Sequence, residues 1–357
     1  MKLSTTTRYP QSVVLGAALL SARTAFAAAS VDEFIALVKS EKQEDKVKAW
    51  HMAAEQDATV VSPLASLLFS EDLPTAKCAN ECLIKLVHSV GQDTGNPKRK
   101  EITKALVALI DPAQPARSTE ALRHLSCIAD GDVVAQIAPC LADEILFEEA
   151  VYCLERIPGA EAEAALLDGL KKAPEAQQSR LLVALARRPS AATLEAVAPL
   201  TQSENKKVAV TAFETISRIG RTPTSEWRVP RCRPEEGPLY RTYMKSLVTL
   251  GDALIASGKG KETYRIFSRL LDREEIEEHY RCAAIVSLSK VDDAEAVKMI
   301  VGKLLFEPSY IVRFNAKNAL LTMRGSSVAS ALQEAEAAAT GDLKALLQEI
   351  ITTRKQA

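Results

Sequence analysis

The sequence predicts an all-α fold, an α-α superhelix (solenoid) of stacked two-helix repeats. Ala and Leu are abundant, whereas only 5% of the 357 residues are aromatic, a composition that suits close packing of helices. Runs that alternate polar and apolar residues, as a half-buried strand requires, extend over a few residues at most. In addition, one pattern of small residues recurs along the chain about every 30 residues, which is typical of a repeat architecture.

The recurring pattern is a small residue, a second small residue three positions later, and an apolar residue directly after it. On a helix this spacing makes a flat stripe against which a neighbouring helix can lie closely. Consecutive copies lie 30, 42, 29, 31, 28, 75 and 32 residues apart, so two insertions interrupt the array. Between the copies, segments such as 160–172 supply the other helix of each hairpin. The copies are Ala49-Met52-Ala53, Ala79-Cys82-Leu83, Ala121-His124-Leu125, Ala150-Cys153-Leu154, Leu181-Ala184-Leu185, Ala209-Ala212-Phe213, Ala284-Ser287-Leu288 and Ala316-Ala319-Leu320.

One stretch, Ile311-Val-Arg-Phe-Asn-Ala-Lys-Asn-Ala-Leu320, resembles the second helix of the HEAT-like repeat family in its short form. The shared features are Val-Arg, an Ala three residues after the Arg, and Ala-Leu, and Tyr280-Arg281 with Ala284 is similar. The resemblance covers about residues 31–357 and implies an armadillo-type superhelix, while it implies little about function. In other repeats the Arg position holds Lys206, Ala76, Ser118, Phe147 or Gln178, which weakens any ladder of Arg contacts.

The two insertions differ in character. The shorter one is the polar turn cluster 91–100, and the longer one opens with the Pro- and Arg-rich segment 221–238. Residues 239–271 then resemble a single tetratricopeptide hairpin, with Leu250-Gly251 and Phe267 at matching positions and Thr263 where that family has a small residue. Either family implies the same local shape, a packed pair of antiparallel helices.

The N-terminus has the features of a cleaved secretory signal peptide, residues 1–27. Lys2 and Arg8 precede an apolar run, and Ala25-Phe26-Ala27 places small residues where a signal peptidase requires them. The run is too short to span a bilayer, which takes about 20 apolar residues. The alternative is a frayed apolar N-terminal helix, which Arg23 favours. We expect cleavage after this site and a periplasmic or secreted mature protein.

The charge balance argues against nucleic acid as a partner. The whole chain has 45 basic and 46 acidic side chains, a formal net charge of −1, and removal of residues 1–27 leaves 42 and 46, a net charge of −4. A mildly acidic protein lacks the basic surface that binds phosphate backbones. Since no other stretch is long and apolar enough to cross a bilayer, we expect no membrane insertion after signal cleavage.

The predicted organisation has four parts: the signal peptide 1–27, a HEAT-like repeat array 28–220, a Pro/Arg-rich loop 221–238, and C-terminal helical repeats 239–357. The last part comprises the tetratricopeptide-like hairpin followed by HEAT-like repeats. Charged runs within these parts, such as 41–48 and 272–278, are interpreted as solvated helix faces or connections.

Residues suited to catalysis or metal binding are sparse, so no catalytic, metal or cofactor site is predicted. The four His lie far apart, and none belongs to a His-Glu-x-x-His sequence. None is followed by Glu, as in the His-Glu dipeptides with which some helical-repeat enzymes hold two irons. The alternative metal-binding group is Cys78, Glu81 and Cys82, which share about one helical turn.

The seven Cys are interpreted as small core residues, because Cys82 and Cys153 stand where other repeats have Ala or Ser. One or two disulfides are the alternative in an exported protein. A bridge between Cys78 and Cys82 would be strained, since both project from one helix face. His124 also occupies a repeat core position and is expected to be partly buried, with a backbone hydrogen-bond partner.

The candidate partner-binding residues are Trp227, Arg228, Arg231 and Arg233, in the loop 221–238. Trp227 is one of two Trp in the chain, and Trp and Arg are enriched at the hot spots of protein interfaces. A long irregular loop within a compact array is uncommon unless it is functional or disordered. The alternative is a linker between two subarrays whose Trp packs against a helix.

Together these features predict a non-catalytic exported scaffold that binds another protein or a peptide. Stacked hairpins create an extended surface with many shallow contacts and few deep pockets, which suits protein recognition. The alternative is a HEAT-like repeat enzyme, such as a chromophore lyase or a base-excision-type DNA-binding protein. Both kinds of enzyme are expected in the cytoplasm, and the second is expected to have a basic groove.

Overall fold

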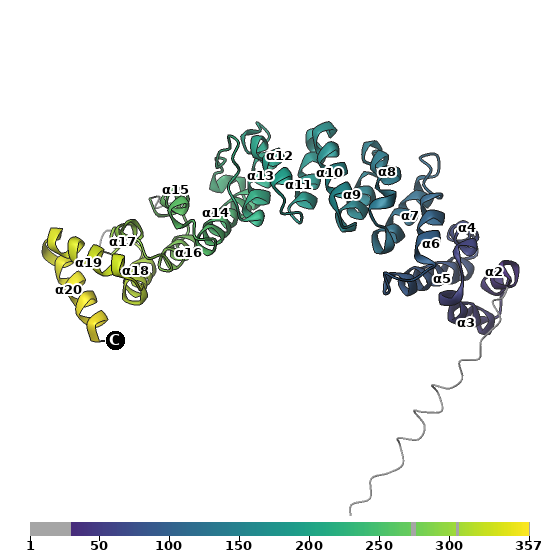
Figure 1. Ribbon diagram of the computed structural model, residues 1–357, viewed down its shortest axis with the longest axis horizontal. Coiled ribbons are helices and arrows are strands. Elements are labelled where there is room, and N and C mark those ends of the chain that lie inside the picture. The colour runs from purple at the N-terminus through teal and green to yellow at the C-terminus, as the bar shows by residue number, and fades with distance from the viewer. Residues whose placement is uncertain (1–29, 273–275, 305–306, 357) are drawn as a thin grey trace, which may run out of the picture. The chain divides into compact units, whose positions relative to one another are not determined.

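A computed structural model of the chain describes residues 30–272, 276–304 and 307–356, and within these ranges it contains helices and no strand (Figure 1). The chain divides into two compact units between Ile128 and Ala129. The prediction of an all-α fold of stacked two-helix repeats is confirmed within each unit. The predicted signal peptide, residues 1–27, lies outside the described residues.

The described part of the first unit, residues 30–128, consists of three stacked helix pairs. The first helices of the pairs make one layer, and the second helices, α3, α5 and α7, pack side by side as a second layer. Short 3₁₀ turns, Ala53–Glu55 and Ala58–Val60, connect the first pair to the next. The α-helices are α2 (Val31–Lys39), α3 (Gln43–Met52), α4 (Val61–Leu67), α5 (Leu73–Gly91), α6 (Arg99–Val107) and α7 (Pro115–Ile128).

The second unit repeats the two-layer arrangement over more helices (Figure 1). Its second layer runs through α9, α11, α13, α14, α16, α18 and α20, each in contact with the next. The helices of this layer are α9 (Phe147–Arg156), α11 (Glu175–Leu185), α13 (Lys206–Ile219), α14 (Pro238–Ala256), α16 (Glu278–Leu288), α18 (Tyr310–Thr322) and α20 (Gly341–Gln356). Those of the first layer are α8 (Val134–Ile137), α10 (Ala160–Lys172), α12 (Ala191–Val197), α15 (Gly260–Leu271), α17 (Ala294–Val301) and α19 (Ser326–Ala338), with 3₁₀ turns at Gly131–Val133, Ala138–Ala142, Ala198–Gln202 and Pro234–Glu236.

The stripe of small residues packs as the sequence predicts. Ala49, Ala79, Ala150 and Ala316, from four different repeats, have no exposed surface, and all four lie on second-layer helices. At these four positions a larger side chain is expected to displace a neighbour. The small residues therefore set how closely successive repeats stack.

Capping residues fix where the helices begin and end. Ser30 and Glu33 form a capping box at the start of α2, with Ser30 Oγ accepting from the Glu33 amide and the Glu33 carboxylate accepting from the Ser30 amide. Asp72 caps α5 in the same way by accepting from the Thr75 amide. At the other end, α13 stops at Gly220, whose φ of 72° is left-handed and therefore favours glycine.

Arginines connect neighbouring second-layer helices at their C-terminal ends. Arg188, just beyond α11, donates to the carbonyls of Leu154 (2.7 Å) and Gly159 (3.0 Å) around the end of α9. Arg354 of α20 likewise donates to the carbonyls of Leu320 and Leu321 near the end of α18. The last carbonyls of a helix lack intrahelical partners and carry partial negative charge, so both guanidiniums stabilise helix ends in an adjacent repeat.

The segment 221–237 takes the place of a missing first-layer helix. It joins α13 to α14, which are neighbours in the second layer. Its hydrogen bonds reach the first layer on both sides, since Thr222 donates to Glu262 of α15 (2.8 Å) and the Thr224 amide donates to Glu195 of α12 (2.8 Å). The longer insertion is therefore a loop that fills a gap between α12 and α15, followed by an additional hairpin.

That hairpin, α14 with α15, is the packed antiparallel pair that the sequence predicts for residues 239–271. Gly251 faces the ring of Phe267 so closely that an added Cβ would lie 2.2 Å from a ring carbon. Phe267 has no exposed surface. The glycine is required because the ring fills the space that a side chain would occupy.

Candidate protein-binding site

Trp227, the residue around which the sequence places a binding site, lies against α13. Its indole stacks on the ring of Phe213, with 6.3 Å between the ring centroids and 15° between the planes. Phe213 is fully buried and also contacts the ring of Tyr243 on α14. Trp227 is half-buried in this position. It therefore packs the loop against α13, and Phe213 in turn connects α13 to α14.

The three arginines beside Trp227 differ in their environments. Arg228 is exposed and pairs with Glu226 at 3.2 Å. Arg231 is exposed as well, and Arg233 lines a 310 Å³ pocket between the loop and α14. Whether the arginines contact a partner stays a prediction.

Glu195 anchors the start of the loop. Its carboxylate accepts from the Thr224 amide and hydroxyl at 2.8 and 2.9 Å and from the Ser225 amide at 2.9 Å. The hydrogen bond from the Ser225 hydroxyl, together with these, lowers the pKa of Glu195 to about 2. The carboxylate is therefore charged at neutral pH, and the loop is held against α12.

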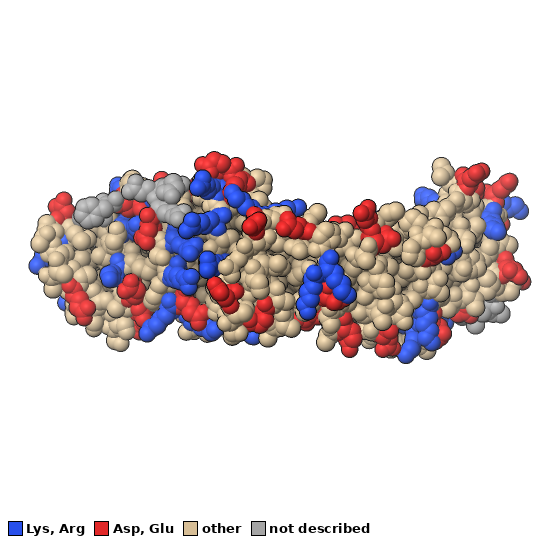
Figure 2. Space-filling view, turned by 90° about the horizontal axis from the view of Figure 1, so that it is seen from above, with Lys and Arg blue, Asp and Glu red and all other residues tan. Residues whose placement is uncertain are grey.

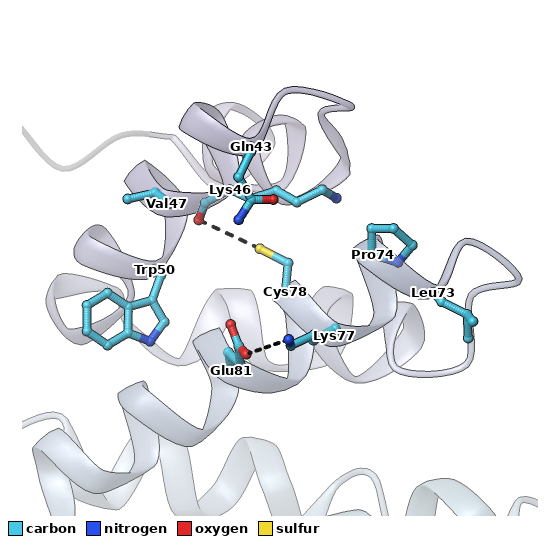
Figure 3. Close-up of a pocket in the computed structure, with 9 residues that line it drawn as sticks. All are labelled: Gln43, Lys46, Val47, Trp50, Leu73, Pro74, Lys77, Cys78 and Glu81. Atoms are coloured by element: carbon cyan, nitrogen blue, oxygen red, sulfur yellow. Dashed lines mark hydrogen bonds and ion pairs between the residues drawn. The ribbon is translucent and has the colours of Figure 1, made fainter.

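A second candidate site, which the sequence analysis did not identify, is a groove between α3 and α5 in the first unit (Figure 3). It consists of two adjoining hollows of 470 and 380 Å³, and Trp50 lines both of them. Glu81 is the other residue that the two hollows share. We refer to this feature as the Trp50 groove.

The α3 side of the Trp50 groove is apolar. Val47 and Trp50 of α3 and Ala54 of the 3₁₀ turn that follows it line the groove at helical spacing, so they form one stripe. Val47 is 46% exposed and Trp50 is 40% exposed, values high for large apolar side chains. On the α5 side, Leu73 and Ile84 are also exposed. Figure 3 shows Val47 and Trp50 on one side of the first hollow, with Leu73 and Pro74 on the other.

The α5 side of the groove carries charge. The Lys85 ammonium lies 3.4 Å from the centroid of the Trp50 ring, a cation–π contact. Lys77 and Glu81 approach each other at 3.9 Å, and both are well exposed. Lys85 forms no ion pair with any of the described residues. Partial burial lowers the pKa of Lys85.

The floor of the groove is polar, and its buried polar groups have hydrogen-bond partners. Lys46 is buried, so the prediction that the run 41–48 is solvated is wrong at this residue. Its ammonium donates to the Val38 carbonyl at 3.0 Å and to the Thr75 hydroxyl at 3.1 Å, bonds that offset the cost of burying the charge. Cys78 donates a long hydrogen bond of 3.8 Å to the Lys46 carbonyl. Lys46 thus joins three elements beneath the groove.

None of the seven Cys forms a disulfide bond. Cys82 and Cys153 are fully buried, which confirms their interpretation as small core residues. The interpretation is wrong for Cys127, which is exposed, and Cys282 is only half-buried. Cys78 and Cys82 share a hydrogen bond that lowers the pKa of Cys78 and, together with burial, raises that of Cys82. Among the described residues, no three His, Cys, Asp or Glu side chains are placed to hold a metal ion.

His124 is buried at its repeat core position, as predicted, with 8% of its surface exposed. Its Nε2 has no hydrogen-bond partner. Burial lowers its pKa to about 4, with smaller contributions from His88 and Arg123. The imidazole is consequently neutral at pH 7 and acts as a packing residue.

One signal in the sequence could have located the Trp50 groove. Val47, Trp50 and Ala54 repeat at helical spacing beside the stripe position Ala49, so α3 has apolar residues on more than the one face that stacking needs. The sequence alone does not show which neighbour covers them. The structure shows that none of the described residues does so completely.

The chain matches no protein-family model and no curated protein. Among solved structures, it is similar to an engineered protein at 17% identity, with 91% of this chain and 98% of that chain covered and a TM-score of 0.39. It is also similar to human deoxyhypusine hydroxylase in complex with glycerol at 19% identity, with 72% and 98% covered and a TM-score of 0.33. TM-scores this low carry no argument about function. Within the described ranges, no helix has the length and apolar character to cross a membrane.

Proposed function

We propose that this protein is a non-catalytic helical-repeat scaffold and that it binds a segment of another protein in the Trp50 groove. The observation that carries the proposal is the exposed stripe of Val47 and Trp50 beside two adjoining hollows. Clustered apolar exposure of this kind marks interaction sites on soluble proteins, and Trp is enriched at interface hot spots. The groove is open and shallow, a shape suited to a peptide chain.

The repeats themselves are proposed to be of the HEAT-like type. The support is the second-layer helices with buried small residues at regular spacing, together with the motif at Ile311–Leu320. In such an array each helix pair contacts only its neighbours, so an exposed groove along the second layer costs little stability elsewhere. This separation of stability from binding suits a scaffold.

The charge distribution favours a protein partner over nucleic acid. Figure 2 shows Lys and Arg intermixed with Asp and Glu over much of the face in view, together with one cluster of Lys and Arg toward its left end. Binding to a phosphate backbone depends on many basic side chains aligned along one path. An intermixed surface instead favours recognition by local side-chain complementarity.

Selection from a random 12-residue peptide display library tests the binding proposal. We expect the purified protein to enrich peptides whose binding is lost in Trp50→Ala and largely kept in Trp50→Phe, because the phenyl ring preserves an apolar anchor. Loss of a central aromatic anchor weakens binding by about 2 kcal/mol or more, roughly thirtyfold.

The matched control is Phe69→Ala, since Phe69 is a large exposed apolar residue of the same unit outside the groove. Its peptide binding should equal that of the wild type. Thermal unfolding of each variant checks that folding is intact. No enrichment on the wild type, or equal binding by Trp50→Ala, would refute the proposal.

Export is proposed separately, from the N-terminal sequence. The mature protein should begin at Ala28 because the Ala25-Phe26-Ala27 site follows a basic and then an apolar stretch. Mass spectrometry of the protein purified from its native cells measures the N-terminus directly. An intact terminus at Met1 or Lys2 in the folded protein would contradict export by this route.

A further inference from the structure

We infer that the Trp50 groove selects an acidic peptide segment that carries a large apolar side chain. The inference rests on the proposed function and adds the chemistry of the partner. It follows from two features of the groove: an apolar wall on α3, and ammonium groups on α5 of which one has no carboxylate partner in the described chain.

The apolar α3 side of the groove determines which side chain of the peptide should bind there. Trp50 separates the two hollows, and its indole is accessible from both. A Leu, Ile or aromatic side chain placed in either hollow would contact the indole on one side and Val47 or Ile84 on the other. Burying such a side chain removes a large apolar surface from water, which makes it the main anchor.

The charged α5 side of the groove determines which residues of the peptide should flank its apolar anchor. Lys85 and Lys77 bring two positive charges to the groove surface, whereas Glu81 brings one negative charge. Lys46 adds a positive charge at the floor, although its ammonium is already hydrogen-bonded. The groove is thus net positive within a chain of net charge −1. A carboxylate from a partner would give the Lys85 ammonium the counter-charge that it lacks.

The dimensions of the groove limit the length of the segment. Early residues of both helices line one hollow and later residues of both line the other, so α3 and α5 run in the same direction along it. Pro74 and Ser89, near the two ends, are about 22 Å apart along α5 at 1.5 Å per residue. An extended peptide covers that distance with about seven residues.

The same selection from the peptide display library tests the inference. The quantity measured is the amino-acid composition of the enriched peptides. We expect them to combine Asp or Glu with a Leu, Ile, Phe, Tyr or Trp within about seven residues. The double variant Lys77→Gln and Lys85→Gln should bind the same peptides roughly three- to tenfold more weakly, because two exposed ion pairs are lost. Added salt should weaken wild-type binding more than binding to this variant.

Reversing the charge of the two lysines provides a second test of the acidic preference. Repeating the selection with Lys77→Glu and Lys85→Glu should shift enrichment from acidic to basic peptides. The matched control is Lys104→Glu, an exposed lysine on α6 outside the groove, which should leave the acidic preference unchanged. These variants lie on the surface, and thermal unfolding checks that each one folds.

The outcomes separate the inference from the proposed function. Enriched peptides that require Trp50 but show no excess of acidic residues would overturn the inference and leave the proposed function standing. An unchanged preference after charge reversal would overturn it as well. A concentration-dependent dimer that Trp50→Ala abolishes would show that a second copy of the chain occupies the groove, and this would also contradict the inference.

Discussion

Replacing Arg281 with Met should destabilise the second unit by about 3–5 kcal/mol. Arg281 of α16 forms an ion pair with Glu307, and the two residues are only 5% and 3% exposed. The Glu307 carboxylate also accepts a hydrogen bond of 3.3 Å from the Ser309 amide, at the start of α18. Without Arg281 the carboxylate would remain buried with its charge uncompensated, which is the costly part of breaking such a pair.

Removing both charges should restore most of the loss. In the double variant Arg281→Met and Glu307→Met no buried charge remains, and a buried ion pair replaced by apolar residues is often neutral in stability. Chemical unfolding followed by Trp227 fluorescence in a Trp50→Phe background reports on the second unit, because Trp227 is then the only Trp. A loss below about 1 kcal/mol in the single variant, or an equal loss in the double variant, would show that the pair is solvated in solution.

The first unit should lose about 3 kcal/mol of stability as the pH falls from 6.5 to 4, on account of His124. Burial holds the pKa of His124 at about 4 in the folded protein, against an ordinary value of 6.5. The unfolded chain therefore takes up a proton near pH 6.5, whereas the folded chain does so only near pH 4. The stabilisation is full above pH 6.5 and is lost through this window.

Trp50 fluorescence in a Trp227→Phe background follows unfolding of the first unit. His124→Gln has a side chain of similar size that does not titrate, so it should flatten the pH dependence between 6.5 and 4. Asp57 and Asp72 also have lowered pKa values, from hydrogen bonds to Thr59 and Thr75, but they titrate below their ordinary value of 3.8. An equally steep loss in His124→Gln would show that another group is responsible.

The fold was predictable because its determinants are local. A small residue at one position and another three residues later is a property of a single helix, and copies about 30 residues apart reveal the stacking. Ala79, Ala150 and Ala316 are buried for this reason. The predicted hairpin at residues 239–271 is likewise set by two adjacent segments and a short turn.

The candidate site depends on contacts between distant residues, which the sequence does not display. The exposure of Trp50 depends on what α5 leaves uncovered, and Lys85 lies over its ring although the two residues are 35 positions apart. Similarly, Glu195 holds Thr224 from 29 positions away. Trp227 is distinguished in the sequence by the arginines around it. Trp50 lies in an ordinary helical sequence, although its ring is the more exposed of the two.

The two Trp residues also provide the most direct test of the central claim, that a partner binds in the Trp50 groove. A ¹H–¹⁵N NMR spectrum of the protein should show two indole N–H signals, and the Trp227→Phe variant assigns them. Titration with a peptide enriched on the wild type is the decisive measurement. The Trp50 signal should shift progressively to saturation while the Trp227 signal stays in place, and a shift of the Trp227 signal with the Trp50 signal unmoved would contradict the account.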